Sequence, residues 1–363
     1  MIIVSSMSFG GMKMLDESAL AKEIWAVAKS SGFTECGIVR TDEMRGYLDA
    51  LQKRIARFPE SEPFYRRFTR FAVPDEIVPW VKSVVICVNW YGEYQMPEHF
   101  EGLIGKSYCF DERMDKLSKE YRGAKRFEVE LEKMGVRFQA KRDFGITAMR
   151  WAAGKAGIGI IRKNNFFYTA KGSWCHLHAY LIDLDVELKN KSEIKKCSES
   201  CDLCMRACPT GALCEPFQTD GTKCISFLLC MNTVAPGKKH YDKCGAWIYG
   251  CDACQNACPF NKRALTGETE FPGLSELAAQ ISHEKILSMD YDTMRQLLPQ
   301  KFWYINPEEV WKWKCNVLNA LRNGREEKAL PLMESALNDP QEEVRNMAKW
   351  AMQAIIDSPH ETI

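Results

Sequence analysis

Cysteine is the residue type that most constrains what this chain can fold into. The sequence contains 16 cysteines, and eleven of them lie between Cys197 and Cys258. A disulfide framework suits a small secreted chain, whereas this chain has 363 residues. The clustering therefore favours metal ligation within one segment.

Two motifs within that segment have the spacing of iron–sulfur ligands. They are Cys197-x3-Cys201-x2-Cys204-x3-Cys208-Pro209 and Cys251-x2-Cys254-x3-Cys258-Pro259. Bacterial ferredoxins use C-x2-C-x2-C-x3-C-P, in which the cysteine before proline ligates the other cluster. Closely spaced thiolates occupy three corners of one cluster, and the chain then turns away, so its next cysteine faces the neighbouring cluster. The sequence therefore predicts two [4Fe–4S] clusters with interleaved ligands.

The second motif lacks a leading cysteine, and Cys224 is the expected supplier, with Cys214, Cys230 and Cys244 as nearby alternatives. Zinc is the alternative metal, but zinc sites usually use separate sets of four without the C-x3-C-P ending. The cysteines outside these sets are expected to behave as small buried hydrophobes. The predicted ligands are Cys197, Cys201, Cys204 and Cys258 for cluster one, and Cys208, Cys224, Cys251 and Cys254 for cluster two.

Composition divides the chain into three regions, and the predicted fold class is α+β. Residues 1–185 mix helical and strand patterns, whereas residues 186–265 form the cysteine-rich segment and residues 266–363 are helical. Within the first region the patterns predict a helix from Ser18 to Ser30, a buried strand from Ser83 to Asn89, and a long amphipathic helix from Asp111 to Gly135.

The C-terminal region carries three segments with helical periodicity. They run from Val310 to Leu321, from Glu326 to Leu337 and from Asp339 to Ile355. Asp339 fits a helix cap and Pro340 the first helical position. The pattern predicts HEAT-type helical repeats, with a simple helical bundle as the alternative.

Charge and hydropathy exclude some classes of function. The formal net charge is +1, so the chain has no whole-surface basic field for nucleic acid, although a local patch stays open. No apolar run approaches the roughly 20 residues that a membrane-spanning helix needs. The N-terminal residues lack a basic start and a continuous apolar stretch, so no signal peptide is expected. The expected location is the cytoplasm, where thiols stay reduced.

Several segments resemble one enzyme family, the epoxyqueuosine reductases. The segment Ile248-Tyr-Gly-Cys-Asp-Ala-Cys-Gln-Asn-Ala-Cys-Pro-Phe-Asn261 resembles the family's second cluster motif, and Lys223-Cys-Ile-Ser-Phe227 resembles the segment that feeds that cluster. Upstream, Lys155-Ala-Gly-Ile-Gly-Ile-Ile-Arg-Lys-Asn164 and Gly172-Ser-Trp174 look like the family's cofactor-domain signature. The resemblance covers nearly the whole chain.

The resemblance implies both an architecture and a reaction. It implies a nitroreductase-like α/β domain that holds base-off cobalamin, a ferredoxin-like double-cluster module and C-terminal HEAT-like repeats. Electrons would come from an external low-potential donor, such as ferredoxin or flavodoxin, and pass through the clusters to cobalt. The substrate would be the epoxide of a modified wobble nucleoside in a tRNA anticodon stem-loop, which is reduced to the alkene.

The resemblance also implies roles for individual residues. The family's D-T-G-P-x-x-E-R segment falls on Asp143-Phe-Gly-Ile-Thr-Ala-Met-Arg150 and makes Asp143 the catalytic acid. Loss of the epoxide oxygen needs a proton, which a buried carboxyl with a raised pKa can supply. A turn or cap role is the alternative for an isolated aspartate. The implied cofactor-binding residues are Tyr108, Arg150, Gly159, Lys163, Asn164, Ser173 and Trp174.

The chain departs from the family pattern around the predicted pocket. Phe144, Ile146 and Met149 replace family residues near Asp143, and Arg162 stands where glycine is usual. These departures keep two alternatives open: a paralogous cobalamin and iron–sulfur reductase with a small-molecule substrate, and a non-catalytic electron-transfer protein. Alternating residues share one side of a strand, so one histidine pair is a candidate for substrate or cobalt contact, with a polar strand edge as the alternative. The pair is His176 and His178.

Three basic sets are candidates for contact with RNA phosphates. Charge runs of this kind are usually solvated faces, which is the alternative interpretation. The sets are Arg66, Arg67 and Arg70; Lys189, Lys191, Lys195 and Lys196; and Lys238, Lys239 and His240.

Overall fold

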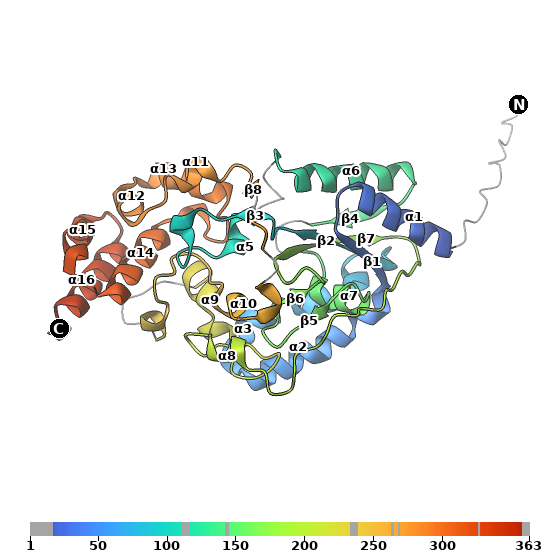
Figure 1. Cartoon of the computed structure of the whole chain (residues 1–363), viewed down its shortest axis with the longest axis horizontal. Coiled ribbons are helices and arrows are strands. Elements are labelled where there is room, and N and C mark those ends of the chain that lie inside the picture. The colour runs from blue at the N-terminus through green and yellow to red at the C-terminus, as the bar shows by residue number, and fades with distance from the viewer. Residues whose placement is uncertain are drawn as a thin grey trace, which may run out of the picture.

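The computed structural model describes residues 17–110, 116–141, 145–232, 239–262, 265–267, 269–325 and 327–357. An antiparallel sheet, the C-terminal helices and the cysteine-rich segment occupy three parts of an elongated molecule (Figure 1). The sheet lies toward the N-terminal end, and helices α14 (Trp311–Gly324), α15 (Leu330–Glu334) and α16 (Glu342–Ile356) lie at the opposite end. The mixture of helices and sheet agrees with the predicted α+β class. None of the described helices is long and apolar enough to cross a membrane.

Four strands form the main sheet, in the order β1-β2-β7-β4. Their bounds are Glu35–Arg40 for β1, Ser83–Trp90 for β2, Cys175–Ile182 for β7 and Phe138–Ala140 for β4. All neighbouring pairs are antiparallel. Strand β2 is buried along seven of its eight residues, as its continuous β-branched run predicts for a strand covered on both faces.

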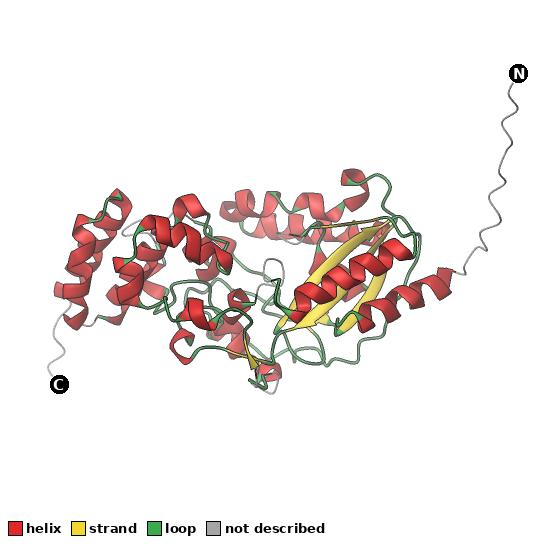
Figure 2. Ribbon diagram, turned by 90° about the horizontal axis from the view of Figure 1, so that it is seen from above, coloured by secondary structure: helices red, strands yellow, loops and turns green. Residues whose placement is uncertain are grey.

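Helices cover the two faces of this sheet (Figure 2). Helices α1 (Glu17–Ser30) and α6 (Lys119–Lys133) pack on one face, where Ile24 and Phe127 join Val85 in one apolar cluster. Helix α7 (Met149–Lys155) packs on the other face, where Ala152 contacts the cluster that contains Val84. The alternation of Val84 and Val85 between the two clusters follows from the two-residue period of a strand.

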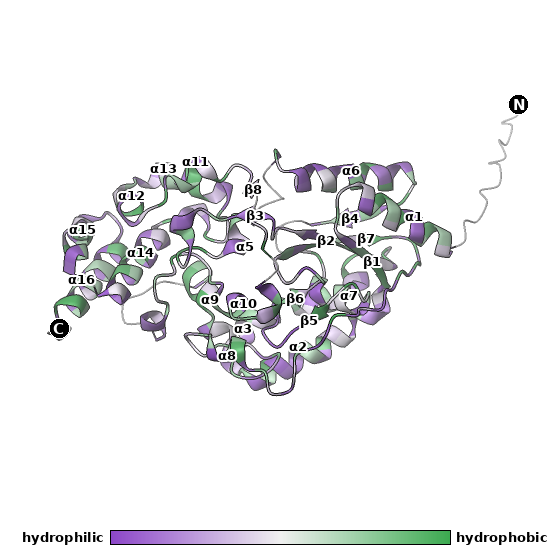
Figure 3. Ribbon diagram, in the orientation of Figure 1, coloured by the Kyte–Doolittle hydropathy of each residue, from purple (hydrophilic) through white to green (hydrophobic). Residues whose placement is uncertain are grey.

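Helix α6 is shorter than predicted. It begins after Ser118, whose side chain accepts a hydrogen bond from the Tyr121 backbone N–H at 3.0 Å. It ends before Gly135, which has a φ of +70°. Residues 111–115 of the predicted helix lie outside the described residues. Figure 3 shows α6 as largely hydrophilic and α9 (Ile225–Cys230) as largely hydrophobic, and α9 contributes four residues to the central apolar core.

Short elements connect these layers. Small strand pairs join β3 (Tyr94–Gln95) to β8 (Thr269–Glu270) and β5 (Ile160–Ile161) to β6 (Phe167–Tyr168). The remaining helices are α2 (Gly46–Arg57), α3 (Glu62–Arg66), α4 (Pro74–Ile77), α5 (Lys106–Cys109), α8 (Leu203–Arg206), α10 (Ala253–Asn256), α11 (Ser275–Ala278), α12 (His283–Ser288) and α13 (Tyr291–Leu297).

The C-terminal helices differ from the predicted ones at their boundaries. Helix α14 (Trp311–Gly324) agrees with prediction, but the second segment is divided into 3-10 turns on either side of a short α15 (Leu330–Glu334). Pro331 lacks the backbone N–H that would continue a helix from the preceding residues, so α15 begins next to it. Helix α16 (Glu342–Ile356) begins after Gln341. The predicted cap at Asp339 and first position at Pro340 are therefore wrong.

Asp339 instead forms a buried polar contact between helices. Its carboxylate lies 2.9 Å from the Lys314 ammonium of α14 and accepts the Tyr291 hydroxyl at 2.5 Å. It also accepts the Gln341 backbone N–H at 2.9 Å. Lys314 and Asp339 are both buried, so the side chain that a sequence pattern assigns to a helix end is used for tertiary packing.

Asparagines on α14 bind the cysteine-rich segment. Asn316 donates to the carbonyls of Leu229 and Ile248 at 3.0 and 2.9 Å. Asn319 donates to the carbonyl of Tyr241 at 3.0 Å. A single apolar core also runs across this contact, from Tyr91 through Leu229 to Trp313. The division at residues 185 and 265 stays a prediction.

Candidate functional site

Four cysteines from both ends of the cysteine-rich segment surround one cavity. Cys197, Cys201, Cys204 and Cys258 line a cavity of about 260 Å³. Burial raises the pKa of the Cys204 thiol, and the thiols of Cys258, Cys197 and Cys201 raise this pKa further. The structure thus brings together the four side chains predicted for cluster one.

The other four predicted ligands also lie together. Burial raises the pKa of Cys254 well above its usual value, and the neighbouring Cys224, Cys251 and Cys208 thiols raise this pKa further. Cys224 reaches them from the residue that precedes α9. Cys214, one of its alternatives, is exposed.

The donor sets fit iron–sulfur clusters. Four thiols around each site are the usual ligand set of a [4Fe–4S] cluster. The cavity beside Cys197 is far larger than a single zinc ion would fill. Residues 196–261 also include every one of the eight cysteines within one continuous stretch, which suits interleaved ligation.

Lys163 fastens the loop that carries the first two cysteines. Its ammonium donates to the carbonyls of Ser198, Glu199 and Cys201 at 2.8, 2.7 and 2.9 Å. Lys163 is 7% exposed, so these bonds are shielded from water. Its described partners are therefore carbonyls of the cysteine-rich segment.

Two further side chains reach the cysteines of cluster one. The Arg162 Nη1 lies 3.5 Å from Cys197 Sγ, and its Nη2 donates to the Lys195 carbonyl at 2.6 Å. The Tyr168 hydroxyl hydrogen-bonds Cys258, and burial followed by this bond raises the pKa of Tyr168. The sequence marks Arg162 only as a residue that stands where the family usually has glycine. Nothing in the sequence marks Tyr168 as a residue near the cysteines.

A buried network joins the predicted cofactor signature to the second cysteine motif. Asn164 donates to the Tyr168 hydroxyl at 2.9 Å and to the Cys254 carbonyl at 3.3 Å. The Ser173 backbone N–H donates to the Asn261 side chain at 2.9 Å, and the Ser173 hydroxyl accepts from Gln255 at 2.8 Å. Asn164 and Ser173 therefore hold the two parts of the chain against each other.

The remaining predicted cofactor-binding residues are packed closely. A Cβ at Gly159 would lie 2.3 Å from the Phe167 ring, so only glycine fits there. The Tyr108 ring packs edge-on against Tyr249 at 5.1 Å between centroids. Trp174 is buried and accepts the Tyr91 backbone N–H, and Arg150 donates to the Asn165 carbonyl.

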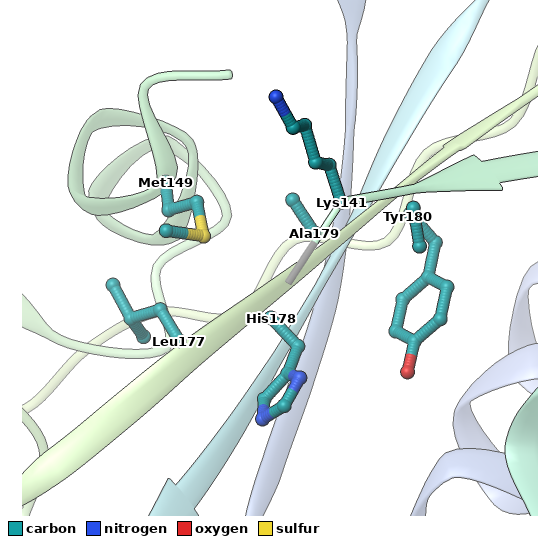
Figure 4. Close-up of a pocket in the computed structure, with 7 residues that line it drawn as sticks. Lys141, Met149, Leu177, His178, Ala179 and Tyr180 are labelled. Carbon is teal, nitrogen blue, oxygen red and sulfur yellow. The ribbon is translucent and has the colours of Figure 1, made fainter. Parts of the chain in front are cut away.

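The predicted acid Asp143 lies outside the described residues. Lys141 precedes Asp143 in the sequence and Met149 follows it, and these two described residues line a cavity of about 20 Å³ together with His178 (Figure 4). That volume is close to the space that one water occupies. Thr147 secures the segment that follows, because its hydroxyl donates to the Phe71 carbonyl at 3.0 Å.

The two histidines lie on strand β7, as predicted. His178 is 3.1 Å from the Asn89 amide nitrogen, and its ring packs against Phe33. The His176 ring packs edge-on between Tyr91 and Phe110, with centroids 5.2 and 4.9 Å away. These surroundings favour a role in packing, and a contact with substrate or cobalt stays a prediction.

Several of the basic residues have acidic partners. Arg66 pairs with Glu62 one helical turn away, and Lys189 lies 3.0 Å from Glu43 and 2.9 Å from Glu187. Lys238 lies outside the described residues. Ion pairing neutralises these charges, which favours the solvated-face interpretation at Arg66 and Lys189.

Known proteins with the same features are epoxyqueuosine reductases. Residues 196–261 match the 4Fe-4S double cluster binding domain family. The epoxyqueuosine reductase of Leadbetterella byssophila is 30% identical over 260 residues, which is 69% of this chain and 82% of that protein. That of Bacillus subtilis is 31% identical over 229 residues, which is 61% of this chain and 57% of that protein.

Solved structures agree with the sequence relatives. The crystal structure of an epoxyqueuosine reductase with an epoxyqueuosine-modified tRNA-Tyr stem loop is 25% identical and superposes with a TM-score of 0.75. The Bacillus subtilis structure, whose catalytic aspartate loop is swung out of the active site, is 26% identical with a TM-score of 0.76. Each comparison covers 94% of this chain and 91% of the other. The chain is therefore an oxidoreductase, and it belongs to the epoxyqueuosine reductase family.

Proposed function

We propose that this oxidoreductase reduces epoxyqueuosine to queuosine in tRNA, with an anticodon stem-loop as the substrate. The observation that carries the proposal is the pairing of two four-cysteine sites with a fold that matches a stem-loop-bound epoxyqueuosine reductase over 94% of the chain. The chemistry of the sites suits this reaction. Converting an epoxide to an alkene consumes two electrons and two protons and releases water.

Two [4Fe–4S] clusters would supply the electrons one at a time. Cys197, Cys201, Cys204 and Cys258 would hold cluster one, and their thiols already surround a cavity. Cys208, Cys224, Cys251 and Cys254 would hold cluster two. An external low-potential donor, such as ferredoxin or flavodoxin, would refill the clusters.

Asp143 is the proposed acid for the leaving oxygen. The support is its place in a segment that resembles the family's catalytic motif, and the relative from Bacillus subtilis carries a catalytic aspartate on a loop that moves. A carboxyl that is shielded from water by bound substrate holds its proton near neutral pH and can deliver it to the oxygen.

Base-off cobalamin is the proposed second cofactor, on the resemblance of residues 155–164 and 172–174. Cobalamin would supply a strongly reducing centre at the substrate. The described contacts of Lys163, Asn164 and Ser173 join the cysteine-rich segment to the rest of the chain. They do not themselves fit a corrin cradle, and no reaction step is assigned to them.

The architecture that goes with this function has three parts. We propose a nitroreductase-like part at 1–185, a ferredoxin-like part at 186–265 and a HEAT-like part at 266–363, in a cytoplasmic protein. Support comes from the covered antiparallel sheet, the paired four-cysteine sites and the packed pair α14 and α16.

An anaerobic turnover assay tests the function. The reconstituted chain, with cobalamin and a strong reductant, is given an anticodon stem-loop that carries epoxyqueuosine, and the product nucleosides are analysed by mass spectrometry. Loss of one oxygen is expected in the wild type. Asp143→Asn is expected to abolish the loss, whereas Asp49→Asn, at an exposed position on α2, is expected to leave it unchanged.

The alternatives give different outcomes. Bound cobalamin without conversion of the stem-loop would refute the tRNA substrate and favour a paralogue with a small-molecule substrate, which the residues Phe144, Ile146 and Met149 motivate. Clusters that form without any spectral change on addition of cobalamin would refute the enzyme hypothesis as stated and favour an electron-transfer protein.

A further inference from the structure

Arg162 places a buried positive charge in the wall of the cluster-one cavity. It is 2% exposed, and it lines the cavity together with the four cysteines of cluster one. The Phe260 ring lies over its guanidinium, with 3.4 Å from Cζ to the ring centroid. Nη1 approaches Cys197 Sγ at 3.5 Å, and Nη2 is fixed by the Lys195 carbonyl at 2.6 Å. The guanidinium is therefore held in one orientation.

The guanidinium lacks an anionic partner within the described part of the chain. Its hydrogen bonds go to a thiol and a carbonyl, and no ion pair with an aspartate or glutamate is found among residues 17–357 where the structure describes them. Its Nε–H is buried and makes no hydrogen bond to any described atom. A buried charge is costly unless an opposite charge compensates it. A [4Fe–4S] cluster with its four thiolate ligands carries a net negative charge and would do so.

We infer that the Arg162 guanidinium is the counter-charge of cluster one and that it raises the reduction potential of this cluster. The inference rests on the two clusters of the proposed function and not on the substrate. Reduction adds one electron to a cluster that is already negative. A nearby cation and N–H···S bonds stabilise the extra charge, and both raise the potential of such clusters. The effect is strong because the site is shielded from water.

The hydrogen bonds described for the other cysteine set come from neutral groups. The Ala253 backbone N–H lies 3.4 Å from Cys251 Sγ, and the Thr210 hydroxyl lies 3.7 Å from Cys208 Sγ. Substitution of Arg162 is therefore expected to act mainly on cluster one. Lys196 offers a matched control, because it lines the same cavity with an exposed ammonium that water screens.

A redox titration followed by electron paramagnetic resonance tests the inference. The full chain and three variants are reconstituted anaerobically and analysed for iron and sulfide. The variants are Arg162→Gln, Arg162→Lys and Lys196→Gln. One electron per cluster is supplied by dithionite. Arg162→Gln is expected to lower one of the two midpoint potentials by at least the equivalent of a tenfold change in equilibrium constant, which is 59 mV. Lys196→Gln is expected to leave both midpoint potentials within the equivalent of a twofold change in equilibrium constant.

A second signal ties the shift to the guanidinium. In protein that contains nitrogen-15 arginine, pulsed resonance is expected to detect nitrogen coupling to one reduced cluster, and Arg162→Gln is expected to remove it. An unchanged pair of midpoint potentials in Arg162→Gln with full iron content would overturn the inference. If that variant loses iron, the nitrogen-15 signal of the wild type decides, because the absence of arginine nitrogen coupling to either reduced cluster would overturn the inference. Lysine keeps the charge but not the planar fork, so Arg162→Lys is expected to lower the midpoint potential less than Arg162→Gln does, and an equal loss in both variants would overturn the counter-charge role.

The two proposals fail differently. Wild-type protein with iron for fewer than two clusters would refute the cofactors of the proposed function. If both clusters are intact and their midpoint potentials are the same in the wild type and in Arg162→Gln, only the inference about Arg162 is refuted.

Discussion

Replacing Lys163 with methionine is expected to loosen the loop that carries Cys197 and Cys201. The change removes three hydrogen bonds from a buried ammonium and leaves the Ser198, Glu199 and Cys201 carbonyls without that donor. A hydrogen bond to a charged group contributes about 1.5–3 kcal/mol net. The three bonds share one donor and one loop, so they do not add fully, and the loss of local stability is expected to be about 3–5 kcal/mol.

This free energy translates into a rate of cluster loss. A tenfold change in an equilibrium corresponds to about 1.4 kcal/mol, so opening of the loop is expected to become more frequent by roughly two to four orders of magnitude. The assay is the anaerobic removal of iron by a chelator, followed by visible absorbance. In Lys163→Met, the iron of cluster one, which is half of the total, is expected to leave rapidly. The iron of cluster two is expected to leave at the wild-type rate.

Lys196→Met is the matched control, because it removes an exposed ammonium near the same loop. Equal rates of iron loss in the two variants would refute the argument from hydrogen bonds. Retention of both clusters with loss of added cobalamin alone would instead assign Lys163 to the corrin.

Three further predictions test other parts of the structure. Cys224→Ala is expected to halve the iron content after reconstitution, whereas Cys214→Ala retains it, and equal iron in both would exclude Cys224 as a ligand. Asp339→Ala leaves the Lys314 ammonium buried without its partner, so hydrogen exchange in α14 and α16 is expected to show a loss of about 3–5 kcal/mol, and unchanged protection would contradict this. Burial lowers the pKa of His283, so the unfolded chain binds more protons. Stability is therefore expected to fall as the pH drops below about 6.5. His283→Gln is expected to flatten that dependence, and identical pH profiles would exclude His283 as its source.

The sequence was most informative where chemistry depends on local spacing. The spacing of the two cysteine motifs predicts that their side chains gather at metal centres, and the structure brings the predicted side chains together. Their assignment to the two clusters, Cys224 included, stays a prediction. The buried strand from Ser83 to Asn89 could also be predicted, because a short, continuous run of apolar β-branched residues is typical of a strand that is covered on both faces.

Contacts between distant residues could not be predicted in this way. Arg162 meets Cys197 across 35 residues, and Tyr168 meets Cys258 across 90. No periodicity connects such pairs, since only the folded topology brings them together. Asp339 illustrates the related difficulty at helix ends, because a side chain that suits a cap was used instead to neutralise Lys314. Asp143 stays a prediction, because it lies outside the described residues.

The asparagines of α14 have a consequence for how the protein matures. They bind the carbonyls of Leu229, Ile248 and Tyr241, so a helix that the ribosome makes later supports the backbone around cysteines that it makes earlier. During synthesis the emerging cysteines lack this support until residues beyond 311 have left the exit tunnel. We therefore expect iron–sulfur assembly to be completed only after α14 has folded, and we expect a chain truncated before Trp311 to lose this support for the backbone of the cysteine-rich segment.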